Sequence, residues 1–147
     1  MSRIIVSISS QEFFQVLKYA QAIHEGKDEP IPELNNSNIP KIETALNQPF
    51  QTFDGIELYK GFNNKAAYLF YLIIDNHVLN NGNKRMACLI LSYFCALNRL
   101  TFNIPDKVLR KLAKEVASPH DHDIMIEKIK STIRRYVGPL TRNGFRN

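Results

Sequence analysis

The chain has 147 residues, of which 44% are hydrophobic, and it carries a formal net charge of +5 at pH 7. This length suffices for one domain with a sizeable core, which excludes a small scaffold that depends on cross-links for its stability. No uninterrupted apolar stretch approaches the ~18 residues of a membrane span, so we expect a soluble, cytoplasmic protein with no membrane partner.

Apolar residues recur at intervals of three and four along most of the chain, and this spacing predicts helices. Ser9 and Glu12 have the spacing of a capping box, which predicts a first helix over about residues 10–25. A polar linker with three prolines follows. The next helix is short, over 41–48, and we expect it to end at Pro49.

Residues 50–59, FQTFDGIELY, interrupt the helical pattern. Asp54 and Gly55 lie between aromatic and aliphatic residues, an arrangement typical of a tight β-hairpin turn. This is the only strand pair that the sequence predicts. Four further helices are expected over 64–76, 84–97, 106–117 and 123–137. Residues 1–137 are thus predicted to form a single, essentially all-α domain with one small hairpin, followed by a flexible tail over 138–147.

The two cysteines, Cys88 and Cys95, lie seven residues apart within one expected helix. Such a spacing separates the Cα atoms by about 10 Å, which exceeds the ~7 Å limit for a disulfide bond. We therefore predict two free, buried thiols, as in a protein of a reducing compartment.

A stretch of ten residues, DNHVLNNGNK, separates two apolar runs that each suit a buried helix. The start of a helix offers unpaired N–H groups and a partial positive charge, so anions bind there. Gly82 permits close backbone approach, and Asn83 can donate through its amide. Lys84 and Arg85 supply positive charge for phosphate oxygens. This loop is therefore a candidate phosphate site.

His77 ends the preceding helix and is the natural group to take a proton from a hydroxyl that attacks the phosphate. Taken singly, a histidine between apolar runs is more often an ordinary core residue, and an Asn-Gly pair is more often a turn. The combination predicts phosphate chemistry, and it requires His77 and the cationic loop to share one cleft.

The nine residues HVLNNGNKR, His77–Arg85, resemble the signature of the Fic/Doc family, H-P-F-x-[D/E]-G-N-[G/K]-R. The resemblance extends over residues 46–87 and to ALNRLTF at 96–102, where the chain is similar to the smaller Doc branch, toxins of toxin–antitoxin pairs. It implies a compact, all-α helical bundle with a small β-hairpin flap.

The resemblance also implies roles for individual residues. His77 is implied to be the general base, with Lys84 and Arg85 beside it in catalysis. The implied nucleotide-binding positions are Asn80, Asn81, Gly82, Asn83, Lys84 and Arg85. The implied flap positions, which align the target polypeptide, are Thr52, Phe53, Asp54 and Gly55.

Two activities are compatible with the resemblance. Fic enzymes transfer AMP to hydroxyl groups of proteins, whereas Doc is a kinase that phosphorylates elongation factor Tu. Lys84 stands where AMP transferases usually have glycine, and Cys88 where they carry a second arginine, so both favour the Doc branch. We therefore expect a phosphotransferase that uses ATP or another nucleoside triphosphate with Mg²⁺ to modify a Ser or Thr hydroxyl of a protein. A translation elongation factor is the expected kind of target and a separate antitoxin the expected partner, with AMP transfer as the alternative.

Three positions depart from the family signature. Val78 and Leu79 replace Pro-Phe, a mild change because Leu79 is still apolar and can anchor the loop. Asn81 replaces the acid that helps to hold Mg²⁺, and a neutral amide is a poorer ligand for a hard cation. Weak, metal-independent or absent activity stays open, including a non-catalytic binding protein of the same fold.

Two other features have ordinary explanations. Residues 118–123, SPHDHD, alternate His and Asp in a manner that suggests a metal site, but a helix amino-terminal cap explains the aspartates better. Residues 84–147 hold 13 Lys and Arg against 5 Asp and Glu, a local net charge of +8. Such a surplus is compatible with an ordinary solvated face and equally with attraction of nucleic acid, nucleotide phosphates or an acidic protein. No aromatic residues alternate with these cations, so nucleic acid is not an expected partner.

Overall fold

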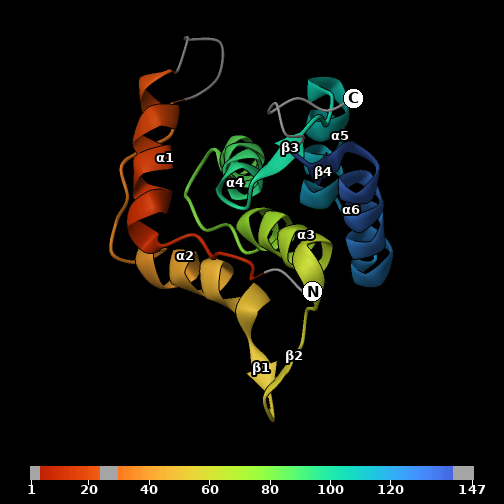
Figure 1. The fold of residues 1–147 in the computed structure, drawn as a ribbon. Helices are drawn as coiled ribbons and strands as arrows, with labels where there is room; N and C mark the ends of the chain where they lie inside the picture. The colour runs from red at the N-terminus through yellow and green to blue at the C-terminus, as the bar shows by residue number, and fades with distance from the viewer. Residues whose placement is uncertain (1–3, 24–29, 141–147) are drawn as a thin grey trace.

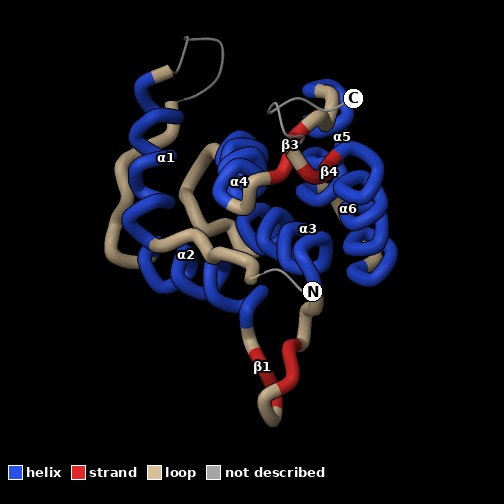
Figure 2. The backbone as a smooth tube through the Cα atoms, viewed as in Figure 1, coloured by secondary structure: helices blue, strands red, loops and turns tan. Residues whose placement is uncertain are grey.

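A computed structural model describes residues 4–23 and 30–140 of the chain. Helices make up most of this part, and two short antiparallel strand pairs complete it (Figures 1 and 2). The α-helices are α1 (Ser10–Ala22), α2 (Asn38–Asn47), α3 (Gly61–Asp75), α4 (Asn83–Leu97), α5 (Asp106–Ala117) and α6 (His122–Tyr136). The remaining elements are the 3₁₀ helix η1 (Gln48–Phe50) and the strands β1 (Thr52–Phe53), β2 (Ile56–Glu57), β3 (Leu100–Phe102) and β4 (Val137–Pro139). The predicted fold class, helical with a small β-hairpin, is confirmed.

Helices α3 and α4 form the centre of the bundle. Figure 1 shows α1 and α2 on one side of this pair and α5 and α6 on the other. Both helices contribute fully buried side chains to the core, among them Phe70 and Ile73 in α3 and Ile90 and Phe94 in α4. None of the described helices is both long and apolar enough to cross a membrane.

The amino-terminal cap of α1 forms as predicted. The N–H of Glu12 donates to Ser9 Oγ at 3.1 Å, and the N–H of Ser9 donates to Glu12 Oε1 at 2.9 Å. This reciprocal pair satisfies two backbone donors that lack helical partners. The helix ends at Ala22, three residues before the predicted end.

Helix α2 begins at Asn38, three residues before the predicted start at residue 41. Pro40 lies in its first turn, where the backbone N–H of any residue would lack an intrahelical partner, so the proline is tolerated there. The prediction placed the start after this proline and was wrong for that reason.

Strands β3 and β4 form a second antiparallel pair, so the prediction of a single strand pair was wrong. Thr101 pairs with Gly138, and Thr101 Oγ donates to the Gly138 carbonyl at 3.0 Å. Strands of three residues that pair across two intervening helices leave no local turn signal in the sequence. Gly138 and Pro139, the first residues of the expected tail over 138–147, lie in β4, and residues 141–147 fall outside the described part.

The cysteines are free thiols, as predicted from their spacing. Cys95 is buried and Cys88 is half-buried. Burial raises the pKa of both thiols to about 12, so both stay protonated and unreactive at neutral pH.

The predicted hairpin at Asp54–Gly55 is confirmed. Both residues have positive φ, 52° and 75°, which is the backbone of a type I′ turn between β1 and β2. The hairpin projects away from the bundle (Figure 1), and Phe53 and Ile56 on it are mostly exposed.

A buried lysine ties this hairpin to the bundle. Lys65 in α3 is 2% exposed, and its ammonium donates to Glu57 Oε1 at 2.7 Å and to the Tyr59 carbonyl. The ammonium also lies 5.5 Å from the centre of the Phe50 ring. Phe50 lies before β1, Glu57 is in β2, and Tyr59 follows β2. The Lys65 side chain therefore contacts the chain on both sides of the hairpin.

Replacing Lys65 by methionine is expected to lower the free energy of unfolding by about 1–3 kcal/mol, because the Tyr59 carbonyl and Glu57 lose their donor. Hydrogen exchange of the Leu58 N–H, which donates to the Gln51 carbonyl across the hairpin, should accelerate. Lys41→Met, at an exposed lysine of α2, is the control. Equal exchange in the two variants would show that Lys65 does not anchor the hairpin.

Candidate active site

The loop between α3 and α4 begins with a strained turn at His77. The chain leaves α3 at Asn76, and His77 has φ 48°, in the left-handed region. Non-glycine residues adopt this conformation at a cost, and such residues concentrate at functional sites. The His77 side chain is exposed, so it is not an ordinary core histidine.

The next two residues anchor the loop in the core. Val78 and Leu79 are both buried, which agrees with the apolar role expected for Leu79. The buried Asn38, at the start of α2, donates from Nδ2 to the Val78 carbonyl at 3.0 Å and to Asn80 Oδ1 at 3.4 Å. Asn38 therefore fixes the position of the loop that follows His77, and the sequence pattern did not single it out.

Asn83, expected to donate to a phosphate, braces the loop in this structure. Its Oδ1 accepts from the Leu79 N–H at 2.8 Å, and its Nδ2 donates to the Leu79 carbonyl at 3.0 Å. The side chain thus closes a ring across the loop and holds the amino terminus of α4 against Leu79.

Gly82 is required by both its conformation and its surroundings. Its φ is 88°, and a Cβ atom at this position would lie 2.6 Å from Ile31 Cγ1 and 3.4 Å from Arg85 Nη2. Arg85 therefore folds back beside the glycine. The N–H of Gly82 donates to Asn81 Oδ1 at 2.8 Å, so an anion at this N–H would displace the Asn81 amide.

The expected cations lie in the first turn of α4. Lys84 is exposed and Arg85 is half-buried. Together with the N–H groups of the first helical turn, they form a positively charged surface at the start of a buried helix. These features fit the phosphates of a nucleotide.

The same loop does not fit Mg²⁺. It holds no carboxylate, and its amide at Asn81 already accepts from Gly82. Among the described residues, no group of three or more His, Cys, Asp or Glu side chains is placed to hold a metal ion. Mg²⁺ binds through one or two carboxylates together with substrate phosphates, so the loop supplies none of the usual protein ligands.

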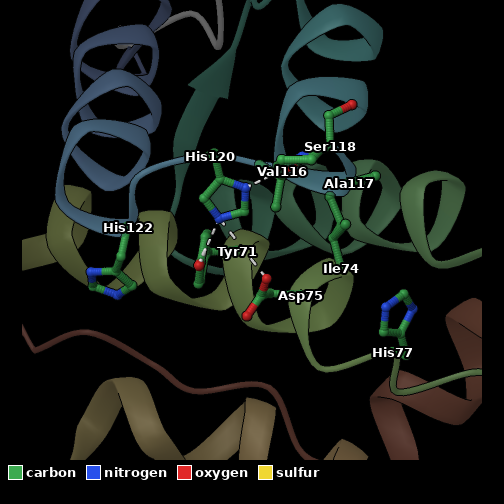
Figure 3. Close-up of a pocket in the computed structure, with 10 residues that line it drawn as sticks. Tyr71, Ile74, Asp75, His77, Val116, Ala117, Ser118, His120 and His122 are labelled. Carbon is green, nitrogen blue, oxygen red and sulfur yellow. Dashed lines mark hydrogen bonds and ion pairs between the residues drawn. The ribbon is translucent and has the colours of Figure 1, made fainter.

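A hollow of about 460 Å³ lies beside His77 (Figure 3). The last turns of α3 form one wall and the junction between α5 and α6 forms the other. None of residues 80–85 lines it. This hollow is therefore not the expected common cleft, because His77 lines it and the cationic loop does not.

Three polar side chains, those of Tyr71, Asp75 and His120, meet in this hollow, and the sequence pattern did not predict this. Tyr71 Oη lies 2.8 Å from His120 Nε2, and Asp75 Oδ1 lies 3.9 Å from the same nitrogen. His120 Nδ1 lies 2.7 Å from the Ser118 carbonyl, which only accepts, so in the neutral ring Nδ1 donates and Nε2 accepts from Tyr71. Burial, and then the nearby Asp75 carboxylate, raise the pKa of Tyr71, which keeps its hydroxyl a donor.

The interpretation of Asp121 as a helix cap is confirmed. The N–H of Ile124 donates to Asp121 Oδ1 at 3.0 Å at the start of α6.

The sequence contained one signal for the cluster in the hollow. Tyr71 and Asp75 are four residues apart on α3 and so share a helical face. Their partner His120 is 49 residues from Tyr71, and no local pattern links the two.

Comparison with known proteins gives one finding. The sequence model of a family described as the Fic/DOC family matches residues 8–95. No curated protein and no solved structure matches the chain significantly. The match covers α1 to α3 and most of α4, including the hairpin and the loop from His77 to Arg85, and it ends before α5 and α6.

Proposed function

Because this chain belongs to the Fic/DOC family, we propose a finer function for it. It is a Doc-like phosphotransferase that acts on a Ser or Thr hydroxyl of a protein. Family members are in general transferases that modify proteins with nucleoside triphosphates. The observation that carries the proposal is the placement of His77, exposed on a strained turn beside a hollow and at the start of the short loop that leads to the cationic first turn of α4.

The chain's own residues supply a proton acceptor and positive charge. The target hydroxyl oxygen forms a bond to the phosphorus atom while the bond from phosphorus to the leaving nucleotide oxygen breaks. His77 takes the hydroxyl proton. Lys84 and Arg85 stabilise the negative charge on the transferring group and the leaving group.

Two reactions differ in which phosphorus is attacked. Attack at the γ-phosphorus of ATP releases ADP and leaves a phosphate on the target, whereas attack at the α-phosphorus releases pyrophosphate and leaves AMP. Lys84 and Cys88 support phosphate transfer, because AMP transferases usually carry glycine and arginine at these positions. AMP transfer is the second candidate.

The deciding experiment uses ATP labelled at either phosphate, the purified protein and a fraction of bacterial translation factors. We expect the γ label to reach a protein and the α label not to. Intact mass of the labelled factor should rise by one phosphate. Labelling from the α-phosphate, with a mass gain of one AMP, would replace the first candidate with the second.

The partners in this proposal are a target protein, such as an elongation factor, and a separate protein that restrains the enzyme in the cytoplasm. Nucleic acid has no role in it. The alternative of a non-catalytic binding protein is favoured by one observation, the absence of a carboxylate in the loop that carries Asn81.

Asn81→Asp is expected to raise the Mg²⁺-dependent transfer rate about tenfold, because a carboxylate is a far better ligand for a hard cation than an amide. The rate should be measured over a Mg²⁺ titration. Asn80→Asp, the same chemical change at the preceding exposed position, is the control and should give no such gain. An unchanged rate in Asn81→Asp would mean that Asn81 does not limit the activity.

A further inference from the structure

We propose that the hollow beside His77 is a subsite for an arginine or lysine side chain of the target, next to the hydroxyl that is modified. The inference rests on the proposed function for the role of His77 as base. It adds a specificity that the family match does not contain, namely a cationic residue flanking the acceptor Ser or Thr.

Charge is the first argument. Among the described residues, the lining contains no Lys or Arg, and Asp75 is its only carboxylate. The other titratable side chains that face the hollow are Tyr71, His77, His120 and His122. The chain as a whole carries +5, so an anionic hollow beside the base stands apart from the overall charge. Such a hollow attracts a cationic side chain and disfavours the phosphates of the nucleotide.

The position of Asp75 is the second argument. It is the last residue of α3, where the helix carbonyls carry partial negative charge, so a carboxylate is unfavourable there. Its side chain is 42% exposed, and its neighbours are His120 Nε2 at 3.9 Å, an ion pair only when that imidazole is protonated, and the Tyr71 hydroxyl, whose pKa is raised by burial and then by this carboxylate. With a neutral His120, the Asp75 carboxylate has no cationic partner in the described lining of the hollow, and a cationic side chain of the target would supply one.

The shape of the hollow is the third argument. The Tyr71 ring contacts His120 and His122 edge to face, with centroid distances of 5.4 and 5.3 Å, and forms an aromatic wall near Asp75 (Figure 3). Ile74 and Val116 add apolar surface. A guanidinium or ammonium group can pair with the carboxylate over the ring while its methylene stem packs on the aliphatic side chains.

The two walls of the hollow differ in whether the family match covers them. The wall with Tyr71 and Asp75 lies within the family match over 8–95, but the wall with Val116 and His120 lies outside it. The hollow is thus formed partly by a segment that the family model does not cover. A subsite of this kind would distinguish targets of this chain while the loop from His77 to Arg85 performs the shared reaction.

Binding of synthetic peptides tests the subsite. Each peptide contains one serine and one arginine, and the position of the arginine relative to the serine differs from one peptide to the next. Each of these peptides has a partner that is identical except that leucine replaces the arginine. Affinity for the full chain is measured by calorimetry, and the imidazole signals of His120 and His122 are followed by NMR. We expect at least one arginine peptide to bind about tenfold more tightly than its leucine partner and to shift both signals.

Asp75→Asn should abolish this preference while leaving thermal stability equal or higher, because it removes a carboxylate from the end of a helix. Asp106→Asn, the same change at an exposed carboxylate paired with Arg110 on α5, should keep the preference. Equal affinity of all peptide pairs for the wild-type chain, or a preference that survives in Asp75→Asn, would overturn the proposal.

Transfer assays with the same peptides separate this inference from the proposed function. Preferential binding of the arginine peptides without any transfer would support the subsite and count against His77 as a catalytic base. Transfer to arginine and leucine peptides at equal rates would support the catalytic role and overturn the subsite.

Discussion

Replacing His77 by asparagine is expected to lower the rate of transfer from ATP by about 10²–10⁴-fold, the usual contribution of a general base. Asparagine is the best replacement, because it tolerates the left-handed backbone at φ 48° and cannot take the hydroxyl proton. The rate is measured with the labelled nucleotide and a target found in the wild-type reaction. Affinity for ATP should change little, since Lys84 and Arg85 are intact.

A matched control separates the loss of the imidazole from an effect on the backbone. Arg99 is also a non-glycine residue with positive φ, 60°, and it is exposed at the end of α4. Arg99→Asn should leave transfer unchanged and have a similar, small effect on thermal unfolding. Full transfer by His77→Asn would exclude His77 as the base and, with it, the proposed mechanism.

Local signals in the sequence were sufficient for much of the fold. The capping box at Ser9 and Glu12 and the turn at Asp54–Gly55 each involve residues within four positions of one another, so the sequence alone contains the full interaction. The apolar periodicity of the two central helices is equally local. These elements formed where they were predicted, to within a few residues.

Interactions between distant segments could not be predicted in this way. The pairing of Leu100 with Pro139 and the bond from Asn38 to the Val78 carbonyl depend on how the helices pack, not on residues nearby in the chain. The hollow beside His77 is of the same kind, since His120 reaches Tyr71 only after α5 and α6 are placed.

The candidate site was predicted by residue type but not by orientation. The sequence identified His77 and the loop to Arg85, yet an asparagine pattern does not reveal whether an amide faces a ligand or the loop itself. In the structure the amides of Asn81 and Asn83 both bond within the loop, to Gly82 and Leu79. A nucleotide that uses the Gly82 N–H must therefore compete with Asn81, which lowers its affinity by the free energy of that internal hydrogen bond.

Gly82→Ala is expected to lower the free energy of unfolding by about 2–5 kcal/mol and to reduce transfer strongly. Alanine in the left-handed region costs about 1–2 kcal/mol. Its Cβ would also lie 2.6 Å from Ile31 Cγ1, and relief of such overpacking costs about 1–3 kcal/mol. The Ile31 side chain is buried, and its carbonyl accepts from Gln21 Nε2 at 3.3 Å, so it does not move away freely.

Gly61→Ala is the matched control for this substitution. Gly61 has nearly the same φ, 80°, but a Cβ there would meet nothing within 4 Å, so the variant reports the backbone cost alone. Chemical denaturation of both variants should show a larger loss for Gly82→Ala, and the difference measures the contact with Ile31. Equal losses would mean that the Ile31 side chain moves aside without cost and that overpacking does not contribute to the effect of Gly82→Ala.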